Sequence, residues 1–226
     1  MKPVIIYALP RSRSTAVLRS CKREIRLLEP FGLRHLHKDE TQGNLWNFRA
    51  ELNSNFVSSG KWGEMVSKMN HINTATKILG TDFHCFLPAR KWFNDCINNQ
   101  THDVFVIERE NREEIFLSYI MADYFGWHET SQVDPFEFTA DNGMLQHIHN
   151  IIDFYLRFYP KVGKVITFDN LPESHFDKKL NHGKSQDSAS KYKYFKNIDV
   201  FRVHIKHILD YYKDEWDSKI KNLNQY

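Results

Sequence analysis

Residues 4–15 read VIIYALPRSRST, and this stretch decides which fold class the chain is expected to adopt. The run from Val4 to Leu9 is continuously apolar and lies between two prolines, which is typical of a strand buried on both faces. A basic, hydroxyl-rich turn follows at residues 11–15, and Ala16 to about Glu24 is expected to form a helix. Strand, polar turn and helix make up the first half of a βα unit.

Apolar runs further along the chain predict more strands, at Ile25–Leu28, Thr76–Leu79, Val104–Ile107 and Val165–Phe168. Helices are expected among them, at Leu45–Phe56, Ala89–Ile97, Arg112–Phe125, Met144–Phe158 and Asp199–Lys221. Strands separated by helices predict an α/β fold with a central, mainly parallel sheet that helices flank on both faces. Ligands of such sheets bind beyond the carboxyl ends of the strands, where the turn at residues 11–15 lies.

The composition narrows the class of protein. A chain of 226 residues with 41% apolar and 26% charged residues suits a single soluble domain spanning residues 1–226. A net charge of +3 is too small to indicate nucleic-acid binding, but it fits a local pocket for a polyanionic small molecule. We expect no membrane span and a cytoplasmic location, because no apolar run approaches the roughly 20 residues that a bilayer requires. Three cysteines at no metal or redox spacing are expected to be reduced thiols.

The turn at residues 11–15 combines two guanidinium groups with three hydroxyls. Arginine forks match the oxygen pairs of phosphate or sulfate, hydroxyls donate from the side, and a helix N-terminus adds unpaired N–H groups. The turn lacks the Walker pattern of glycines and lysine. The alternative is an ordinary polar turn in which Ser or Thr caps the helix.

A second polar constellation follows the strand at Val104–Ile107. This strand delivers Arg109 to the edge where ligands are expected, and Asn111 with Glu114 is a plausible helix cap and capping pair. Ser118 lies nine residues after Arg109, two turns down the helix, so the two share a ligand only if the helix folds back past that edge. The alternative is a surface arginine and an incidental helical serine.

Together the two segments resemble the sulfotransferases that use 3′-phosphoadenosine 5′-phosphosulfate (PAPS). Residues 4–15 resemble the family's 5′-phosphosulfate loop, and residues 104–119 resemble its 3′-phosphate motif. The resemblance implies a three-layer fold like that of the P-loop NTPases. It also implies that Arg11, Ser12, Ser14 and Thr15 bind the 5′-phosphosulfate and that Arg109 and Ser118 bind the 3′-phosphate. Arg13 replaces the family's usual glycine, so it either changes the turn or adds its own charge to the site.

The resemblance also assigns catalytic roles. Arg11 is expected to stabilise the charge on the leaving phosphate, and Glu29, after the second strand, resembles the catalytic base of the carbohydrate and tyrosyl-protein sulfotransferases. His35 and His37 are alternative bases, and a strand-end carboxylate in a salt bridge is the structural alternative for Glu29. Lys77 and Asp82 follow a strand at a place where the family often carries a lysine near its active site.

A late loop resembles the segment that closes over the donor in this family. Lys184, Ser185 and Lys191 are its candidate donor ligands, while a solvated basic loop is the alternative. The twelve histidines show no spacing that predicts a metal site, so no metal is expected.

The sequence therefore predicts an enzyme that moves a sulfuryl group from PAPS to a hydroxyl or amine acceptor and releases 3′-phosphoadenosine 5′-phosphate (PAP). The acceptor, which could be a small molecule, carbohydrate or lipid, is not identified by the sequence, nor is the oligomeric state. One alternative is a P-loop kinase, because residues 165–169 resemble a Walker-B strand that ends in Asp169. The other is a non-catalytic protein that binds PAP or another nucleotide, or RNA.

Overall fold

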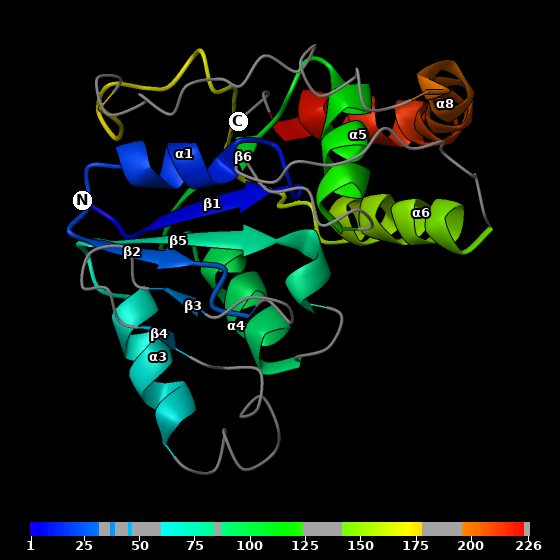
Figure 1. Ribbon diagram of the computed structural model, residues 1–226. Coiled ribbons are helices and arrows are strands. Elements are labelled where there is room, and N and C mark those ends of the chain that lie inside the picture. The colour runs from blue at the N-terminus through cyan, green and yellow to red at the C-terminus, as the bar shows by residue number, and fades with distance from the viewer. Residues whose placement is uncertain are drawn as a thin grey trace.

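The computed structural model describes residues 1–31, 37–38, 45–46, 60–83, 87–123, 142–177 and 196–223. Its centre is a five-stranded sheet with the strand order β2-β5-β1-β6-β7, in which all neighbouring strands are parallel (Figure 1). The strands are β1 (Val4–Ala8), β2 (Ile25–Leu28), β5 (Thr74–Leu79), β6 (Asp103–Ile107) and β7 (Lys164–Ile166). The predicted α/β class and all five predicted strands are confirmed, with small differences at their ends.

The first strand occupies the middle of the sheet. Ala8, the last residue of β1, lies in register with Leu79 at the end of β5 and with Ile107 at the end of β6. The chain segments that follow these strands therefore emerge side by side at one edge, the carboxyl edge. Since β2 pairs with β5 as far as Leu28, the segment that begins with Glu29 emerges there too.

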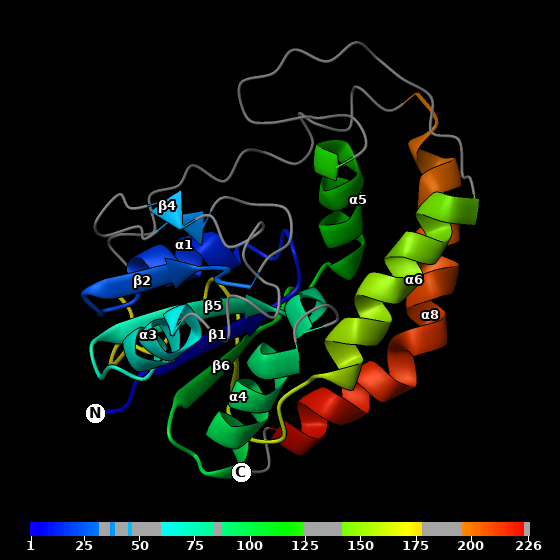
Figure 2. The same ribbon diagram turned by 90° about the horizontal axis from the view of Figure 1, so that it is seen from below.

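Helices cover both faces of the sheet, as Figures 1 and 2 show. One face carries α1 (Ser14–Ser20), whose Val17 and Leu18 pack on residues such as Ile6 and Phe105. The opposite face belongs to a larger core that includes Tyr7 and Ile78. That core is closed by α3 (Lys61–Met69), α4 (Leu87–Asn98), α5 (Arg112–Asp123), α6 (Asn142–Arg157) and α8 (Ile198–Leu223). The result is a three-layer, P-loop-like arrangement.

Two of the expected helices differ from the prediction. The first begins at Ser14 and ends at Ser20, because Cys21 adopts an extended conformation. The helix expected at residues 45–56 is wrong at its start, since Leu45–Trp46 forms a strand, β4, that pairs antiparallel with β3 at His37–Lys38. Residues 47–56 lie outside the described part of the chain.

Besides β3 and β4, the helix α3 and the short 3-10 helix η1 (Gly80–Phe83) that follows β5 were not predicted. Gly80 belongs to a tight contact, because a Cβ atom there would lie 2.6 Å from Tyr155 Cα and 2.7 Å from Tyr7 Oη. Within the described residues, no helix is both long enough and apolar enough to cross a bilayer. Cys21 and Cys96 are buried free thiols, as expected, and Cys85 lies outside the described residues.

Candidate functional site

The turn after β1 has an unusual backbone. Arg11 and Arg13 both have φ of 65°, and Glu29, after β2, has φ of 50°. Residues other than glycine seldom adopt positive φ, and each such residue costs about 1 kcal/mol or more. Because such strain concentrates at functional sites, its presence at three positions of the carboxyl edge marks this edge as the candidate site.

The hydroxyl groups of the turn are mostly turned inward. Ser12 and Ser14 are buried, and Ser12 Oγ donates a hydrogen bond of 2.8 Å to the carbonyl oxygen of Leu9. The helix α1 starts after Arg13 with no side-chain cap, so the alternative in which Ser or Thr caps it is wrong. A helix of seven residues has a small dipole, and the side chains of the turn must therefore supply most of its attraction for an anion.

The two predicted motifs meet directly. Arg11 Nε donates a hydrogen bond of 3.2 Å to Ser118 Oγ, although the two residues are 107 positions apart. The helix α5 thus folds back past the carboxyl edge, as a ligand shared between the motifs requires. Ser118, which was predicted to share a ligand with Arg109, contacts Arg11 instead.

Arg109 follows β6 and forms an ion pair with Glu114, in which both side chains are mostly buried. Asn111 Oδ1 accepts a hydrogen bond of 3.2 Å from the backbone N–H of Glu114, so Asn111 caps α5 as predicted. The capping pair differs from the expectation, because the Glu114 carboxylate binds the Arg109 guanidinium. Arg109 and Arg11 leave neighbouring parallel strands, which lie about 4.8 Å apart.

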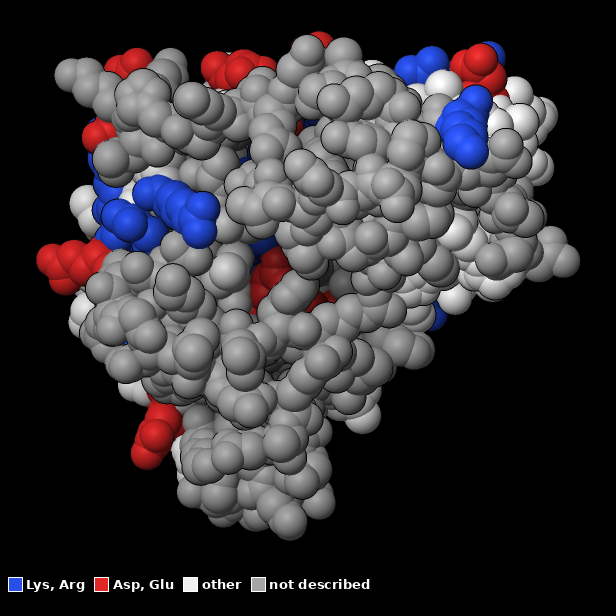
Figure 3. All heavy atoms as spheres, in the orientation of Figure 1, with Lys and Arg blue, Asp and Glu red and all other residues white. Residues whose placement is uncertain are grey.

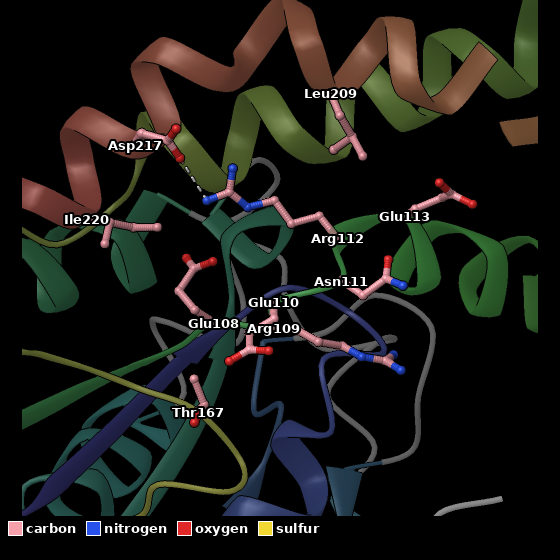
Figure 4. Close-up of a pocket in the computed structure, with 10 residues that line it drawn as sticks. All are labelled: Glu108, Arg109, Glu110, Asn111, Arg112, Glu113, Thr167, Leu209, Asp217 and Ile220. Carbon is pink, nitrogen blue, oxygen red and sulfur yellow. Dashed lines mark hydrogen bonds and ion pairs between the residues drawn. The ribbon is translucent and has the colours of Figure 1, made fainter. Parts of the chain in front are cut away.

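A hollow of about 650 Å³ opens beside Arg109 (Figure 4). In this view the Arg112 side chain reaches to Asp217 on α8, 3.1 Å away, while the Arg109 side chain extends in a different direction. Residues 11–15 are not part of its lining, so this hollow does not by itself join the two motifs. The lining consists of Glu108, Arg109, Glu110, Asn111, Arg112, Glu113, Thr167, Leu209, Asp217 and Ile220.

Glu108 lines this hollow and is held by two hydrogen bonds. Its carboxylate accepts hydrogen bonds from Tyr155 Oη at 2.7 Å and from Trp216 Nε1 at 3.1 Å, which ties the end of β6 to α6 and α8. Burial raises the pKa of Glu108, and the two hydrogen bonds oppose part of that rise. Glu108 was not predicted as a site residue, although a glutamate directly before the predicted ligand Arg109 was a visible signal.

The opposite side of the turn contains a buried ion pair. Lys77, within β5, donates a hydrogen bond of 2.8 Å from Nζ to Thr15 Oγ1 and also pairs with the Glu29 carboxylate. The Lys77 and Glu29 side chains are only 5% and 10% exposed. The predicted base Glu29 therefore lies at the predicted edge and forms the salt bridge that was its structural alternative. The Lys77 ammonium also links it to Thr15 of the turn.

Asp82 lies buried next to this pair. Its Oδ2 accepts a hydrogen bond of 2.8 Å from the backbone N–H of Leu79. Burial, reinforced by the negative charge of Glu29, raises the pKa of Asp82 from 3.8 to about 8, against the opposing effects of that hydrogen bond and of Lys77. Asp82 is consequently mostly protonated at neutral pH.

Arg13 keeps the left-handed conformation that a glycine would adopt without strain. Its guanidinium carbon lies 5.2 Å from the centre of the Phe168 ring, which is a cation–π distance. Phe168 follows β7, so this contact joins the turn to the end of another strand. The charge of Arg13 is therefore retained at the carboxyl edge.

Several predicted residues cannot be placed. Lys184, Ser185, Lys191 and His35 lie outside the described residues, and only the backbone of His37 is described, in β3. The described residues contain no group of three or more His, Cys, Asp or Glu side chains arranged to hold a metal ion.

Charged groups of both signs appear on the face shown in Figure 3, and no single basic field covers its described part. Near the middle of this face, close to where β1 and β5 end in Figure 1, acidic atoms are visible with basic atoms beside them. Local pairing of charges, as at Lys77 and Glu29, is therefore more informative about this protein than its net charge.

The fold and the site define a three-layer, P-loop-like α/β protein with a strained, basic turn after its central strand. Comparisons with protein-family models, with curated proteins and with solved structures found no match to this chain.

Proposed function

We propose that this protein is a PAPS-dependent sulfotransferase, which transfers a sulfuryl group to a hydroxyl or amine acceptor and releases PAP. The observation that carries the proposal is the hydrogen bond between Arg11 and Ser118. It brings together a 5′-phosphosulfate-type turn and a 3′-phosphate-type helix that are far apart in the sequence. A donor with anionic groups on the 5′ and 3′ positions of one ribose requires such proximity.

The donor would bind along the carboxyl edge. Arg11, Thr15 and the turn at residues 12–14 would hold its 5′-phosphosulfate, and Arg109 with Ser118 would hold its 3′-phosphate. Arg109 would then bind the phosphate either in place of Glu114 or together with it. Both are open to a guanidinium, because it offers five N–H donors. Ser12 contributes mainly by holding the turn, since its hydroxyl already donates to Leu9.

In the proposed reaction the acceptor oxygen or nitrogen attacks the sulfur in line with the leaving oxygen. A bond forms between the acceptor and sulfur, and the bond between sulfur and the bridging phosphate oxygen breaks. PAP leaves with the additional negative charge, which Arg11 stabilises, and the acceptor's proton passes to Glu29. Lys77, which contacts both Thr15 and Glu29, is a second cation within reach of the developing charge.

The kinase alternative receives less support from the geometry. It needs Asp169 as a magnesium ligand, but Asp169 is exposed and follows β7, the edge strand, which β6 separates from β1. A non-catalytic nucleotide-binding protein would use the same anion site. Measurement of turnover distinguishes such a protein from an enzyme.

Thermal unfolding with PAP, AMP and ATP plus Mg²⁺ tests the donor assignment. PAP should raise the melting temperature most, because AMP lacks the 3′-phosphate and ATP places its charge at one end only. A larger shift with ATP and Mg²⁺ would favour the kinase. Equal shifts with PAP and AMP would contradict a 3′-phosphate site.

A Glu29→Gln variant then separates enzyme from binder. With labelled PAPS and a panel of alcohols, sugars and amines, the wild-type protein should form sulfated product. The variant should lose at least 100-fold in turnover, within the range of general base catalysis, while its affinity for PAP stays within a few-fold of wild type. Unchanged turnover in the variant would remove Glu29 from the mechanism.

A further inference from the structure

Lys77 is the link between the two halves of the proposed site. Its ammonium contacts Thr15, at the start of α1, and Glu29, after β2, so one cation bridges the anion side and the base side. Lys77 lies on β5, between β1, which leads to the turn and α1, and β2, which leads to Glu29. Movement of the Lys77 ammonium towards Thr15 therefore changes the electrostatic environment of Glu29.

A base that is paired with an ammonium is a weak base. The positive charge favours the ionised carboxylate and makes uptake of a proton less favourable. In the structure described here, Glu29 is in this paired state. For Glu29 to accept a proton from an acceptor, the contact with Lys77 has to weaken.

The surroundings allow the ammonium to move towards an anion. Lys77 has a flexible four-carbon stem, and its Nζ already contacts the hydroxyl of Thr15. Among the described residues, Asp82, after β5, is a titratable group that interacts with both Glu29 and Lys77. Asp82 is mostly neutral at pH 7, because burial raises its pKa to about 8, and so it competes little for the ammonium.

We propose that Lys77 couples occupancy of the anion site to the basicity of Glu29. An anion bound beside Thr15 attracts the ammonium away from Glu29, and the carboxylate then becomes able to accept the acceptor's proton. The coupling deepens the proposed function and rests on its anion site, but it does not depend on which nucleotide carries the anion. In the enzyme it makes donor binding a condition for acceptor activation.

Carbon-13 NMR of protein labelled in its glutamate carboxyl groups tests the coupling. The Glu29 resonance is identified by its absence from the spectrum of E29Q. Its titration with pH is followed in the free protein, with saturating inorganic sulfate or phosphate, and with saturating PAP. We expect the midpoint of the Glu29 titration to move upward by at least half a pH unit when any of these anions binds.

Two Lys77 variants are the matched controls. In K77M an anion should move the Glu29 midpoint by less than half of the wild-type shift, because only its direct repulsion remains. In K77R, which retains the charge, the shift should be largely preserved. If K77M does not fold, K77Q, which removes the charge but keeps a polar end that can hydrogen-bond, replaces it in the same comparison.

The outcomes separate this coupling from the identity of the donor. A shift with sulfate or phosphate but no binding of PAP supports the coupling and contradicts the PAPS assignment. Binding of PAP with no change in the Glu29 midpoint overturns the coupling and leaves the donor assignment standing. Failure of sulfate, phosphate and PAP to bind at all would overturn both.

Discussion

Arg11 Nε lies 3.2 Å from Ser118 Oγ and donates a hydrogen bond to it, which links the turn after the central strand to the second turn of α5. The contact does not compensate for burial of polar groups, because Arg11 is exposed and Ser118 is only partly buried. The contact instead holds a guanidinium and a hydroxyl next to each other at the carboxyl edge.

Replacing Arg11 with Ala should weaken PAP binding by about 10- to 100-fold, the range for one hydrogen bond to a charged group. S118A should have a smaller effect, and the double variant should lose less than the sum of the two, because the residues share one ligand. Isothermal titration calorimetry with PAP measures all three. R19A is the control, since Arg19 is an exposed arginine in the last turn of α1, the helix that follows the turn containing Arg11. Wild-type affinity in R11A would contradict the site.

Arg13 allows backbone strain to be separated from charge at one position. R13G should leave the free energy of unfolding within ~1 kcal/mol of wild type, because relief of the left-handed strain offsets the lost contact with Phe168. R13A retains the strained conformation without the contact, and it should be about 1 kcal/mol less stable than R13G. Urea unfolding measures both differences.

The same two Arg13 variants report on the ligand. If the charge of Arg13 serves the anion, R13G and R13A should lose PAP affinity to the same extent despite their different stabilities. Equal stability of the two variants would mean that the left-handed conformation is not required.

The sheet could be predicted from the sequence because two of its inner strands contain continuous apolar runs. Val4–Leu9 and Val104–Ile107 carry that signal directly, and the sheet register then places the segments that follow them at one edge. The short strands β3 and β4 could not be predicted, since two residues show no periodicity. The helix α3 carried a readable signal, with Trp62, Met65, Val66 and Met69 at helical spacing.

The side-chain geometry of the site was less predictable. The identity of Arg11 and Ser118 as site residues followed from local motifs, but their direct contact depends on how α5 folds back over the edge, which no local pattern encodes. Lys77 lies inside a buried strand, where an apolar pattern gives a lysine no role. Its contacts with Thr15 and Glu29 join residues from three different parts of the chain, so they depend on the tertiary fold.

Asp82 should make stability depend on pH. Its pKa is about 8 in the folded protein against an ordinary value of 3.8, so the folded state binds the proton more tightly than the unfolded state. Stability from this residue is therefore greatest at low pH and is lost as pH rises from about 4 to 8, by at most ~1.4 kcal/mol per pH unit.

The comparison with D82N isolates this effect. Asn stays neutral, and its side-chain oxygen can still accept the hydrogen bond from Leu79. The free energy of unfolding of D82N minus that of the wild type should increase steadily between pH 5 and pH 8, as measured by urea unfolding at each pH. Groups that titrate elsewhere cancel in the difference. Parallel curves for the two proteins would show that Asp82 is ionised throughout.

Two glycines should respond to alanine in opposite directions. At Gly80 the new Cβ would lie 2.6 Å from Tyr155 Cα, and since that neighbour is backbone, α6 has to shift. G80A should therefore lose about 1–3 kcal/mol of stability, as overpacking does. At Gly63, within α3, a Cβ would meet nothing within 4 Å, and G63A should gain up to about 1 kcal/mol from helix propensity.

Because α6 also holds Tyr155 against Glu108, the G80A shift should reach the hollow beside Arg109, whereas G63A should leave it unchanged. Urea unfolding gives the two stabilities, and PAP affinity gives the effect on the site. A stable G80A protein with wild-type affinity would show that η1 and α6 are not held as closely together as the structure indicates.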